Sequence, residues 1–534
     1  MIGQGVDMKT KFYWSIPACG TKKTIALLAV ASLLTVAPAG RAASPSELLE
    51  HGIYAEETKG DLDAAMKLYQ QAVNEAKGAQ AVAAQAQLRL GVCHYKKGDS
   101  AEAMAALEQV VKDYPEQKEF VAQAGDYLFR ALPLLPAPWE DGEQLQSDIR
   151  SAAGVKRGSI MATVTAGETN GQKTWRLDGY VFVDPVKETL IRFEVDAATL
   201  RPLRHSLKIK WGREINTVYL PGLAEINVTG EAEAKYVPLP GAVYDDEEIG
   251  LLTRCLPLAT NYALSLSCAK LDVSSGTRSL SPVNLRVIGT EKLTVPAGTY
   301  DCFKVEDGTN LISWFSTDTH HNFVKWKYED SGVYAELVSV TRYHPGEPVQ
   351  YRDPVFGFSL TAPPGWGFDR YSGNDAAAGV KALANTPSFS DDQAKILGAA
   401  RNNPKSEAVV YLLDPGLNYY CEVNVGRLEK LDENARKSPR AWAESDITGI
   451  IRAGKSLADL KVRTDSWQEL TLTGNSAVIA IGDYGEGAAK QTVYGAWIFD
   501  GTNTVKFYFV VDATDFETMR PILEKIVRSY THSQ

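Results

Sequence analysis

The chain has 534 residues, of which 44% are hydrophobic and 23% are charged, an ordinary composition for globular domains that each bury a core. Its formal net charge of -10 argues against nucleic-acid binding, because phosphate binding needs clustered Lys and Arg. At about 100–200 residues per domain, the length predicts two to four domains.

Residues 1–43 are typical of a secretory signal sequence. Basic residues precede an uncharged run at Thr24–Gly40, and small residues end the segment at two candidate cleavage sites, Ala37-Pro-Ala39 and Arg41-Ala-Ala43. The run is shorter and less apolar than the roughly 20 residues of a membrane span. We therefore expect an exported protein, periplasmic or extracellular, with a retained N-terminal anchor as the alternative. Cys19 precedes the apolar run, so it cannot be the lipid-bearing cysteine of a processed lipoprotein. Any membrane contact would therefore be peripheral or through the uncleaved segment.

Residues 44–135 have the composition of a helical region with an internal repeat. Gly60-Asp61 returns as Gly98-Asp99 after 38 residues, and each pair supplies a helix-ending Gly followed by an N-cap for the next helix. Pro133, Pro136 and Pro138 then form a stiff linker, since proline favours extended chain. The pattern predicts a pair of helical repeats.

The stretch Ala84–Pro115 resembles a tetratricopeptide repeat at Leu90-Gly91, Tyr95, Gly98-Asp99, Ala103-Met104, Val110 and Tyr114-Pro115. The copy at Leu49–Val73 matches less well, because Ile53 stands where the repeat usually has Gly. We expect Gln117–Leu132 to be a capping helix, and the short stack to lean on the next domain.

The resemblance implies a concave groove for a peptide or a neighbouring protein. In the better copy, Gln85, Leu88, Val92 and Tyr95 would face this groove. The alternative is that the groove is filled by an adjoining domain of the same chain. Both interpretations remain open on the sequence alone.

Residues 139–345 change from a helical period to a period of two. Alternating apolar and polar residues predict an antiparallel sheet with one solvated face. The segment Asp245–Cys255 is the single good helix, with acids at its start that suit the helix dipole. The expected strands are 174–183, 190–195, 207–211, 284–288, 301–306 and 333–340.

The segment Val295–Thr299, which reads Val-Pro-Ala-Gly-Thr, predicts a tight reversal between two strands. With the strands that follow it, this segment resembles a bacterial envelope family of unassigned function. The resemblance implies a curved antiparallel β half-barrel around one helix, similar to lipoprotein carriers, with an apolar concave face. It also implies an envelope role, and brings no catalytic residues.

Residues 350–534 begin with Tyr351–Trp366, which ends in Pro-Pro-Gly-Trp and resembles the opening of the PsbP and Mog1 fold. The resemblance implies a C-terminal α/β sandwich. Its expected strands are 422–425, 477–481, 491–499 and 504–511, and its expected helices are 439–452 and 516–530.

Cys255, Cys268 and Cys302 fall in one region of an exported chain, so Cys255 could form a disulfide with either of the others. Domains of this size need no such crosslink, which favours buried free thiols over a disulfide.

The sequence lacks the motifs of known catalytic and cofactor sites. Asp318 with His320-His321 is the tightest group of metal-ligand types, but adjacent residues of an extended chain point to opposite faces, which favours a solvated loop. The acids Asp245–Glu248 could bind a cation or form a solvated helix start. We therefore expect no catalytic residues, no metal and no cofactor. The hypothesis is a non-enzymatic exported adaptor that binds a protein partner, with a carrier of an apolar, lipid-like ligand as the alternative.

Overall fold

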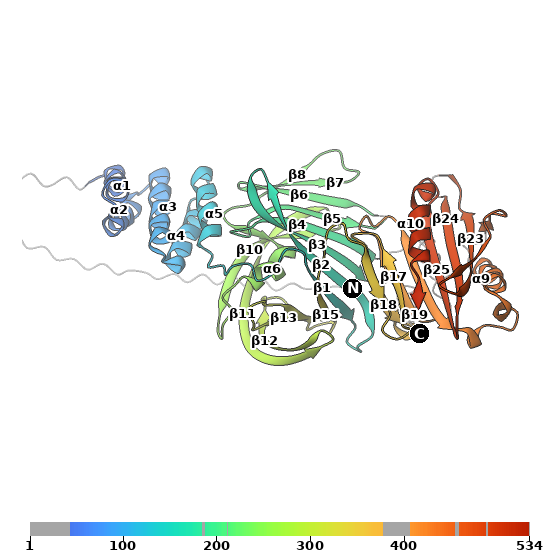
Figure 1. The fold of residues 1–534 in the computed structure, drawn as a ribbon. Helices are drawn as coiled ribbons and strands as arrows, with labels where there is room; N and C mark the ends of the chain where they lie inside the picture. Colours follow the sequence, from blue (N-terminus) through green and yellow to red (C-terminus); the bar gives the residue numbers. More distant parts are fainter. Residues whose placement is uncertain are drawn as a thin grey trace, which may run out of the picture. The chain divides into compact units, whose positions relative to one another are not determined.

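The computed structural model describes residues 43–183, 187–210, 212–376, 406–453, 459–487 and 490–532 (Figure 1). The expected signal sequence lies outside the described residues, apart from its last position. Over the described ranges, no helix is both long and apolar enough to cross a membrane.

The N-terminal region is a stack of helices, drawn in blue in Figure 1. Gly60 and Gly98 follow the first helix of each pair with φ of 68° and 84°, a left-handed conformation that glycine adopts easily. Asp61 caps the next helix by accepting a 2.9 Å hydrogen bond from the backbone N–H of Ala64. Asp99 has the same N-cap position but makes no side-chain capping bond. The helices are α1 (Pro45–Ile53), α2 (Leu62–Glu75), α3 (Gln80–Lys97), α4 (Ser100–Asp113) and α5 (Lys118–Ala131).

Small residues let the two helices of each pair approach closely. A Cβ at Gly91 in α3 would lie 2.7 Å from Leu107 of α4, and a Cβ at Gly52 in α1 would lie 2.5 Å from Tyr69 of α2. Gly52, not Ile53, therefore holds the glycine position of the first repeat, which corrects the alignment expected from a uniform 38-residue offset.

A π-helical turn, η1 (Tyr54–Thr58), explains the difference in offset. Gly52 precedes Gly60 by eight residues, whereas Gly91 precedes Gly98 by seven. A π-turn accommodates one extra residue within a helix. The first repeat thus keeps its helix contacts despite the insertion.

The central region is one strongly curved sheet, made of 15 strands of the described chain in the order β8 to β1 followed by β15 to β9. Neighbouring strands are antiparallel, except that β9 pairs with β10 in parallel. Strands β1–β8 form the first meander and β9–β15 the second. The two meanders are joined where β1 pairs with β15. The strands are β1 (Glu143–Arg150), β2 (Lys156–Thr169), β3 (Gln172–Val183), β4 (Lys187–Asp196), β5 (Pro202–Ile209), β6 (Glu214–Leu220), β7 (Leu223–Val228), β8 (Lys235–Pro238), β9 (Val243–Asp245), β10 (Ala263–Asp272), β11 (Thr277–Val295), β12 (Gly298–Glu306), β13 (Leu311–Ser316), β14 (Phe323–Tyr328) and β15 (Tyr334–Arg342).

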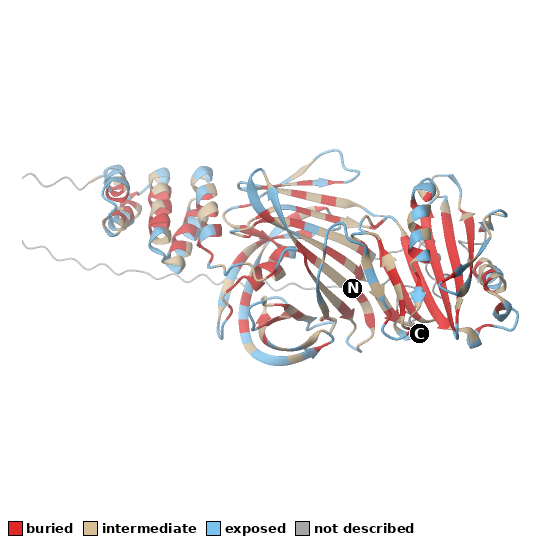
Figure 2. Cartoon of the chain, in the orientation of Figure 1, coloured by how far each residue is buried: buried red, intermediate tan, exposed pale blue. Residues whose placement is uncertain are grey.

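One face of this sheet packs on a short helix, α6 (Ile249–Arg254), which follows the 3-10 turn η3 (Asp246–Glu248). Asp245 and Glu248 form a capping box at the start of this turn. Leu251 and Leu252 belong to a core cluster with side chains from both meanders, and Figure 2 shows buried positions alternating along these strands. The expected single helix of the central region is present among the described residues.

The reversal expected at Val295–Thr299 is also present, since β11 ends at Val295 and pairs there with Gly298 of β12. The tip of this hairpin bends back, and the N–H of Ala297 donates a 3.1 Å hydrogen bond to the carbonyl of Leu337 in β15. Cys302 and Trp314 lie in the cluster beneath the tip, whereas the adjacent Phe303 packs with the α6 core. Because successive strand residues alternate faces, the hairpin covers a second, smaller core on the opposite face of the sheet.

The C-terminal region contains an eight-stranded sheet in the order β18-β19-β20-β25-β24-β23-β21, with β22 pairing β23. Helices α9 (Pro439–Ala453) and α10 (Phe516–Arg528) pack against this sheet. The sheet strands are β18 (Gly367–Ser372), β19 (Ser406–Leu413), β20 (Tyr420–Arg427), β21 (Lys461–Val462), β22 (Gln468–Leu472), β23 (Asn475–Tyr484), β24 (Gln491–Asp500) and β25 (Asn503–Asp512), and a smaller sheet contains β16 (Val349–Arg352), β17 (Phe358–Ala362) and β26 (Thr531–His532).

Candidate partner-binding face and buried polar clusters

The predicted groove residues on α3 separate into two kinds. Leu88 and Val92 are only 4% and 7% exposed, and they pack in a core with α4 and α5. Gln85 is partly exposed, and so is Tyr95, whose ring meets that of Tyr127 edge-to-face at 5.7 Å. The structure therefore leaves Gln85 and Tyr95 accessible and places Leu88 and Val92 inside the stack.

A buried carboxylate joins the two repeats beside these residues. The π-turn carries Glu56, which accepts hydrogen bonds from the Tyr69 hydroxyl at 2.6 Å and from Lys96 at 2.6 Å. Arg89 also donates to Glu56, at 3.0 Å. Burial raises the pKa of Glu56, but the hydrogen bonds from Lys96, Tyr69 and Arg89 outweigh it and hold the pKa below its ordinary value. Glu56 thereby orients two cationic side chains of α3.

A second polar cluster lies within the central sheet, where β5 and β6 of the first meander meet β9 to β11 of the second. Its centre is Arg278, whose side chain is fully buried. The guanidinium uses all five of its donors. They reach Thr217 (3.1 Å), the carbonyl of Ala269 (2.6 Å), Asp246 (3.4 Å), Asp245 (2.9 Å) and Nδ1 of His205.

These contacts determine the protonation of His205. Nδ1 accepts from Arg278, so the neutral ring carries its proton on Nε2. Burial is the main cause that lowers the pKa of His205 to about 4, and Arg278 lowers it further against the attraction of Asp245. Burial and the charge of Asp245 raise the pKa of Asp246 to about 7. The cluster thus holds a neutral imidazole and one strong ion pair, Asp245 with Arg278.

The acids Asp245–Glu248 have mixed surroundings, since Glu247 is exposed and Asp246 is partly exposed, whereas the other two are buried. Asp245 is 0% and Glu248 1% exposed, so the expectation of a solvated helix start is wrong for these two residues. Arg278 supplies the positive charge next to Asp245. Within the described residues, no three His, Cys, Asp or Glu side chains are grouped so as to hold a metal ion.

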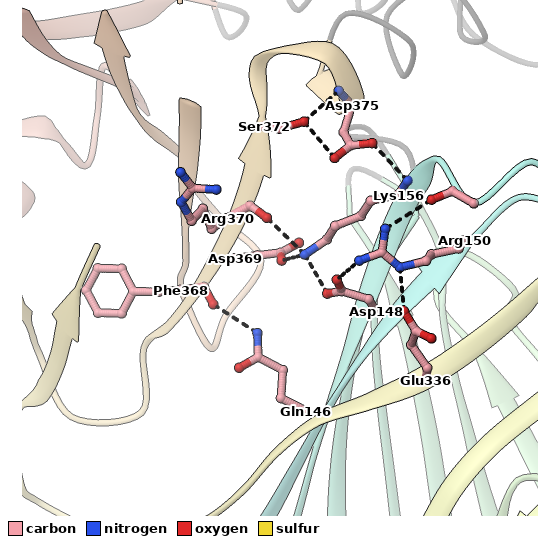
Figure 3. A network of polar contacts seen from close by, with 11 residues as sticks. Gln146, Asp148, Arg150, Lys156, Glu336, Phe368, Asp369, Arg370, Ser372 and Asp375 are labelled. Carbon is pink, nitrogen blue, oxygen red and sulfur yellow. Dashed lines mark hydrogen bonds and ion pairs between the residues drawn. The ribbon is translucent and has the colours of Figure 1, made fainter. Parts of the chain in front are cut away.

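A third cluster links the central sheet to the C-terminal sheet (Figure 3). The ammonium of Lys156 in β2 lies 2.7 Å from Asp148 of β1 and 2.6 Å from Asp369 of β18. Its third donor reaches the carbonyl of Arg370 at 3.0 Å. Arg150 completes the network by bridging Asp148 and Glu336, each at 2.8 Å. A buried charge is tolerated only when it is paired and hydrogen-bonded in this way.

A second lysine makes a similar connection. Lys210 lies 2.6 Å from Glu188 and donates a 2.8 Å hydrogen bond to the carbonyl of Tyr419. Tyr180 and Phe182 of β3 pack in the same cluster as Tyr411 of the C-terminal sheet. Charged and aromatic contacts therefore bind the two sheets over several strands.

The three cysteines of the central region are not joined by a disulfide in this structure. Cys255, Cys268 and Cys302 are all buried free thiols, which agrees with the interpretation favoured from the sequence. Burial raises the pKa of Cys255 and of Cys302 to about 12, so these thiols are poorly reactive.

The loop with the paired histidines is organised by Arg254 of α6. This guanidinium donates to the carbonyls of His320 (3.0 Å) and His321 (3.1 Å) and pairs with Glu143 at 2.6 Å. Nδ1 of His321 lies 2.9 Å from the carbonyl of Arg254, whereas His320 is exposed. The two rings thus have different environments: the His321 ring packs against α6, and the His320 ring lies in solvent.

The sheet face around α6 is filled by the chain's own apolar side chains. Phe129 of α5 and Trp139 of the linker join Leu251, Leu252 and strand residues in one buried cluster. A lipid-like ligand, as implied by the carrier resemblance, would have to displace these side chains.

Two family profiles match parts of the chain. Residues 148–337 match a family described as a protein of unknown function, DUF3108, and residues 85–116 match the tetratricopeptide repeat. The repeat expected at Ala84–Pro115 is thereby confirmed. No curated protein matches the sequence.

Several solved structures share distant similarity with the chain. The cyanobacterial PsbP of Synechocystis is 9% identical over 36% of this chain and 95% of its own, with a TM-score of 0.25. A protein with a YmcC-like fold from Bacteroides fragilis is 12% identical over 40% of this chain and 100% of its own, with a TM-score of 0.16. The MucA/MucB complex of Pseudomonas aeruginosa gives 11% identity over 77% of this chain and 99% of that chain, with a TM-score of 0.16. Similarity at this level transfers no function to this chain.

Proposed function

We propose that the protein is a non-enzymatic adaptor of the bacterial cell envelope that binds a protein partner through α1–α5. The observation that carries the proposal is the tetratricopeptide repeat at residues 85–116, a helical unit that commonly presents its first helix to other proteins. Gln85 and Tyr95 stay accessible on that helix, and Glu56 holds Lys96 and Arg89 next to them.

The non-enzymatic part of the proposal rests on how the polar clusters are built. Arg278 and Lys156 each direct all of their side-chain N–H groups to acceptors of the same chain. Side chains so fully paired stabilise the fold and offer little to a substrate. The envelope location rests on the uncharged run Thr24–Gly40 and the small residues that follow it.

Affinity capture from the envelope tests the adaptor role with a matched pair of variants. Gln85→Arg places a long cation on the accessible face of α3, and Gln71→Arg makes the same change at an exposed position of α2. We expect the native chain and Gln71→Arg to recover one stoichiometric partner, and Gln85→Arg to recover about tenfold less of it. Equal melting curves for the two variants serve as the control.

The proposal is wrong if no stoichiometric partner is recovered, or if chemical crosslinks to it map outside α1–α5. Export is tested separately, by sequencing the N-terminus of the mature protein from the envelope fraction, which we expect to begin near Ser44.

A further inference from the structure

Helix α5 corresponds to the first helix of a repeat that has no second helix. Gly125 follows Gly91 by 34 residues, and both are buried glycines in the middle of their helices. After α5 the chain enters the proline-rich linker at Leu132 instead of turning into a partner helix. If α5 were only a capping helix, nothing would account for the burial of its face at Gly125, which a second helix covers in the other repeats.

The close approach at this glycine identifies what covers that face. In α1 and α3, the atoms nearest to an added Cβ at Gly52 or Gly91 belong to the second helix of the same repeat. At Gly125 the nearest atom is the carbonyl oxygen of Gly241, at 2.8 Å, followed by two more backbone atoms of Gly241. Gly241 has a φ of 77°, a conformation that other residues rarely adopt.

Two side chains that follow Gly241 in the chain extend the contact. Ala242 packs against the cluster that contains Leu88, Val92 and Leu128. The ring of Tyr244 meets that of Phe129 at 5.1 Å.

Arg201, which precedes β5, adds a polar contact to the same helix. Its guanidinium pairs with Asp126 at 2.6 Å and covers Phe129 at 5.5 Å.

We propose that residues 240–244 of the central domain take the place of the second helix of a third repeat, so that the repeat stack is completed by another domain of the same chain. Each repeat buries its apolar face only against its neighbour, and an isolated α5 would expose Leu128 and Phe129. The stack and the central sheet therefore open together at this contact. The inference is independent of any partner, because it concerns only contacts within the chain.

Hydrogen exchange of the full chain measures the contact directly. Gly125→Leu drives a side chain into the Gly241 backbone, and overpacking of this kind should speed exchange in α5 and in residues 240–244 by about tenfold or more. Gly449→Leu is the control, since Gly449 also lies within a helix and a Cβ there meets nothing within 4 Å. Unchanged exchange in residues 240–244 of Gly125→Leu would overturn the proposal.

If Gly125→Leu does not fold, a second set of variants that exchanges the charges of Arg201 and Asp126 tests the same contact. The side chains of Arg201 and Asp126 are 27% and 47% exposed, so both positions tolerate substitution. Asp126→Arg and Arg201→Asp should each speed exchange in α5 and in residues 240–244 by roughly threefold to tenfold, and the double variant should restore most of the protection. Additive effects, or effects confined to the substituted segment, would show that the two domains open independently.

Discussion

Buried cations of this protein use all of their hydrogen-bond donors on the chain itself. Lys156 contacts two carboxylates and one carbonyl, and Arg278 satisfies five acceptors. Removing a buried charge costs more than the pair itself contributes, because its partners are left charged and desolvated.

Lys156→Met should destabilise the protein by about 3–5 kcal/mol, because Asp369 would remain buried without a cation and Asp148 would keep only Arg150. Urea denaturation provides the measurement. Lys292→Met is the matched control, since Lys292 and its partner Asp301 are both 68% exposed at 3.7 Å, and it should leave the unfolding free energy nearly unchanged. Similar losses in the two variants would contradict the role given to burial.

The Arg278 cluster predicts two opposite dependences of stability on pH. His205 has a pKa of about 4 in the folded chain against an ordinary 6.5, so the unfolded chain binds the extra proton and stability is lost as pH falls from 6.5 to 4. Asp246 has a pKa of about 7 against 3.8, so the folded chain holds the proton and stability is lost as pH rises from 4 to 7. Each group changes the slope of the unfolding free energy against pH by up to about 1.4 kcal/mol per pH unit.

Two variants separate these contributions in denaturation curves measured from pH 4 to 6.5. His205→Asn keeps an acceptor for Arg278 and does not titrate, so its stability should rise relative to the native chain as pH falls. Asp246→Asn should show the reverse trend. If the unfolding free energies of both variants change with pH as that of the native chain does, neither His205 nor Asp246 has the proposed shift in pKa.

These clusters could not be predicted from the sequence. Lys156, His205 and Arg278 lie in alternating strands, where a charged residue normally marks the solvated face. They are buried because a second layer covers that face, either the C-terminal sheet or the opposite meander. Only the packing of distant segments reveals their surroundings.

At the scale of elements, the first repeat shows how an insertion is absorbed. The repeat pattern predicted the helices and the turns at Gly60 and Gly98, but not the π-turn at Tyr54–Thr58. A one-residue difference in glycine spacing was the available signal. Its consequence is that Glu56 enters the interior and contacts three side chains.

Glu56→Gln should lower stability by about 1–3 kcal/mol, because it removes the charge that Lys96 and Arg89 share. The loss should be largest above pH 4.5, since the pKa of Glu56 is lowered in the folded chain and its contribution disappears on acidification. Hydrogen exchange in α1 and α2 reports the effect. Glu50→Gln, at an exposed position of α1, should leave exchange in both helices as it is.

The Val295–Thr299 hairpin is a second element that local sequence predicts only in part. Pro296 and Gly298 specify a tight turn between two strands. The bend that lays Ala297 against Leu337 depends on the apolar cluster around Trp314, which gathers residues far apart in the sequence. Turn chemistry is local, whereas curvature follows from packing.

At the scale of the whole molecule, the buried lysines predict cooperative unfolding of the central and C-terminal sheets. Separating them would expose Tyr180 and Phe182, leave Asp369 without Lys156, and remove the hydrogen bond from Lys210 to the carbonyl of Tyr419. Calorimetry of the full chain should therefore show one transition for both sheets, and a Lys156→Met, Lys210→Met double variant should show two. Two transitions in the native chain would mean that the interface contributes little.

The class of each region could be predicted from the sequence, because helical and strand periods, turn glycines and the repeat pattern are local properties of the chain. The sequence also predicted the tetratricopeptide repeat at Ala84–Pro115, with Gln85, Leu88, Val92 and Tyr95 together as groove residues. The three-dimensional packing was needed to show that Leu88 and Val92 are buried, that Cys255, Cys268 and Cys302 are free, and that Lys156 and Arg278 are enclosed. The physical reason is that burial and pairing depend on which distant surfaces meet, and no short stretch of sequence records that.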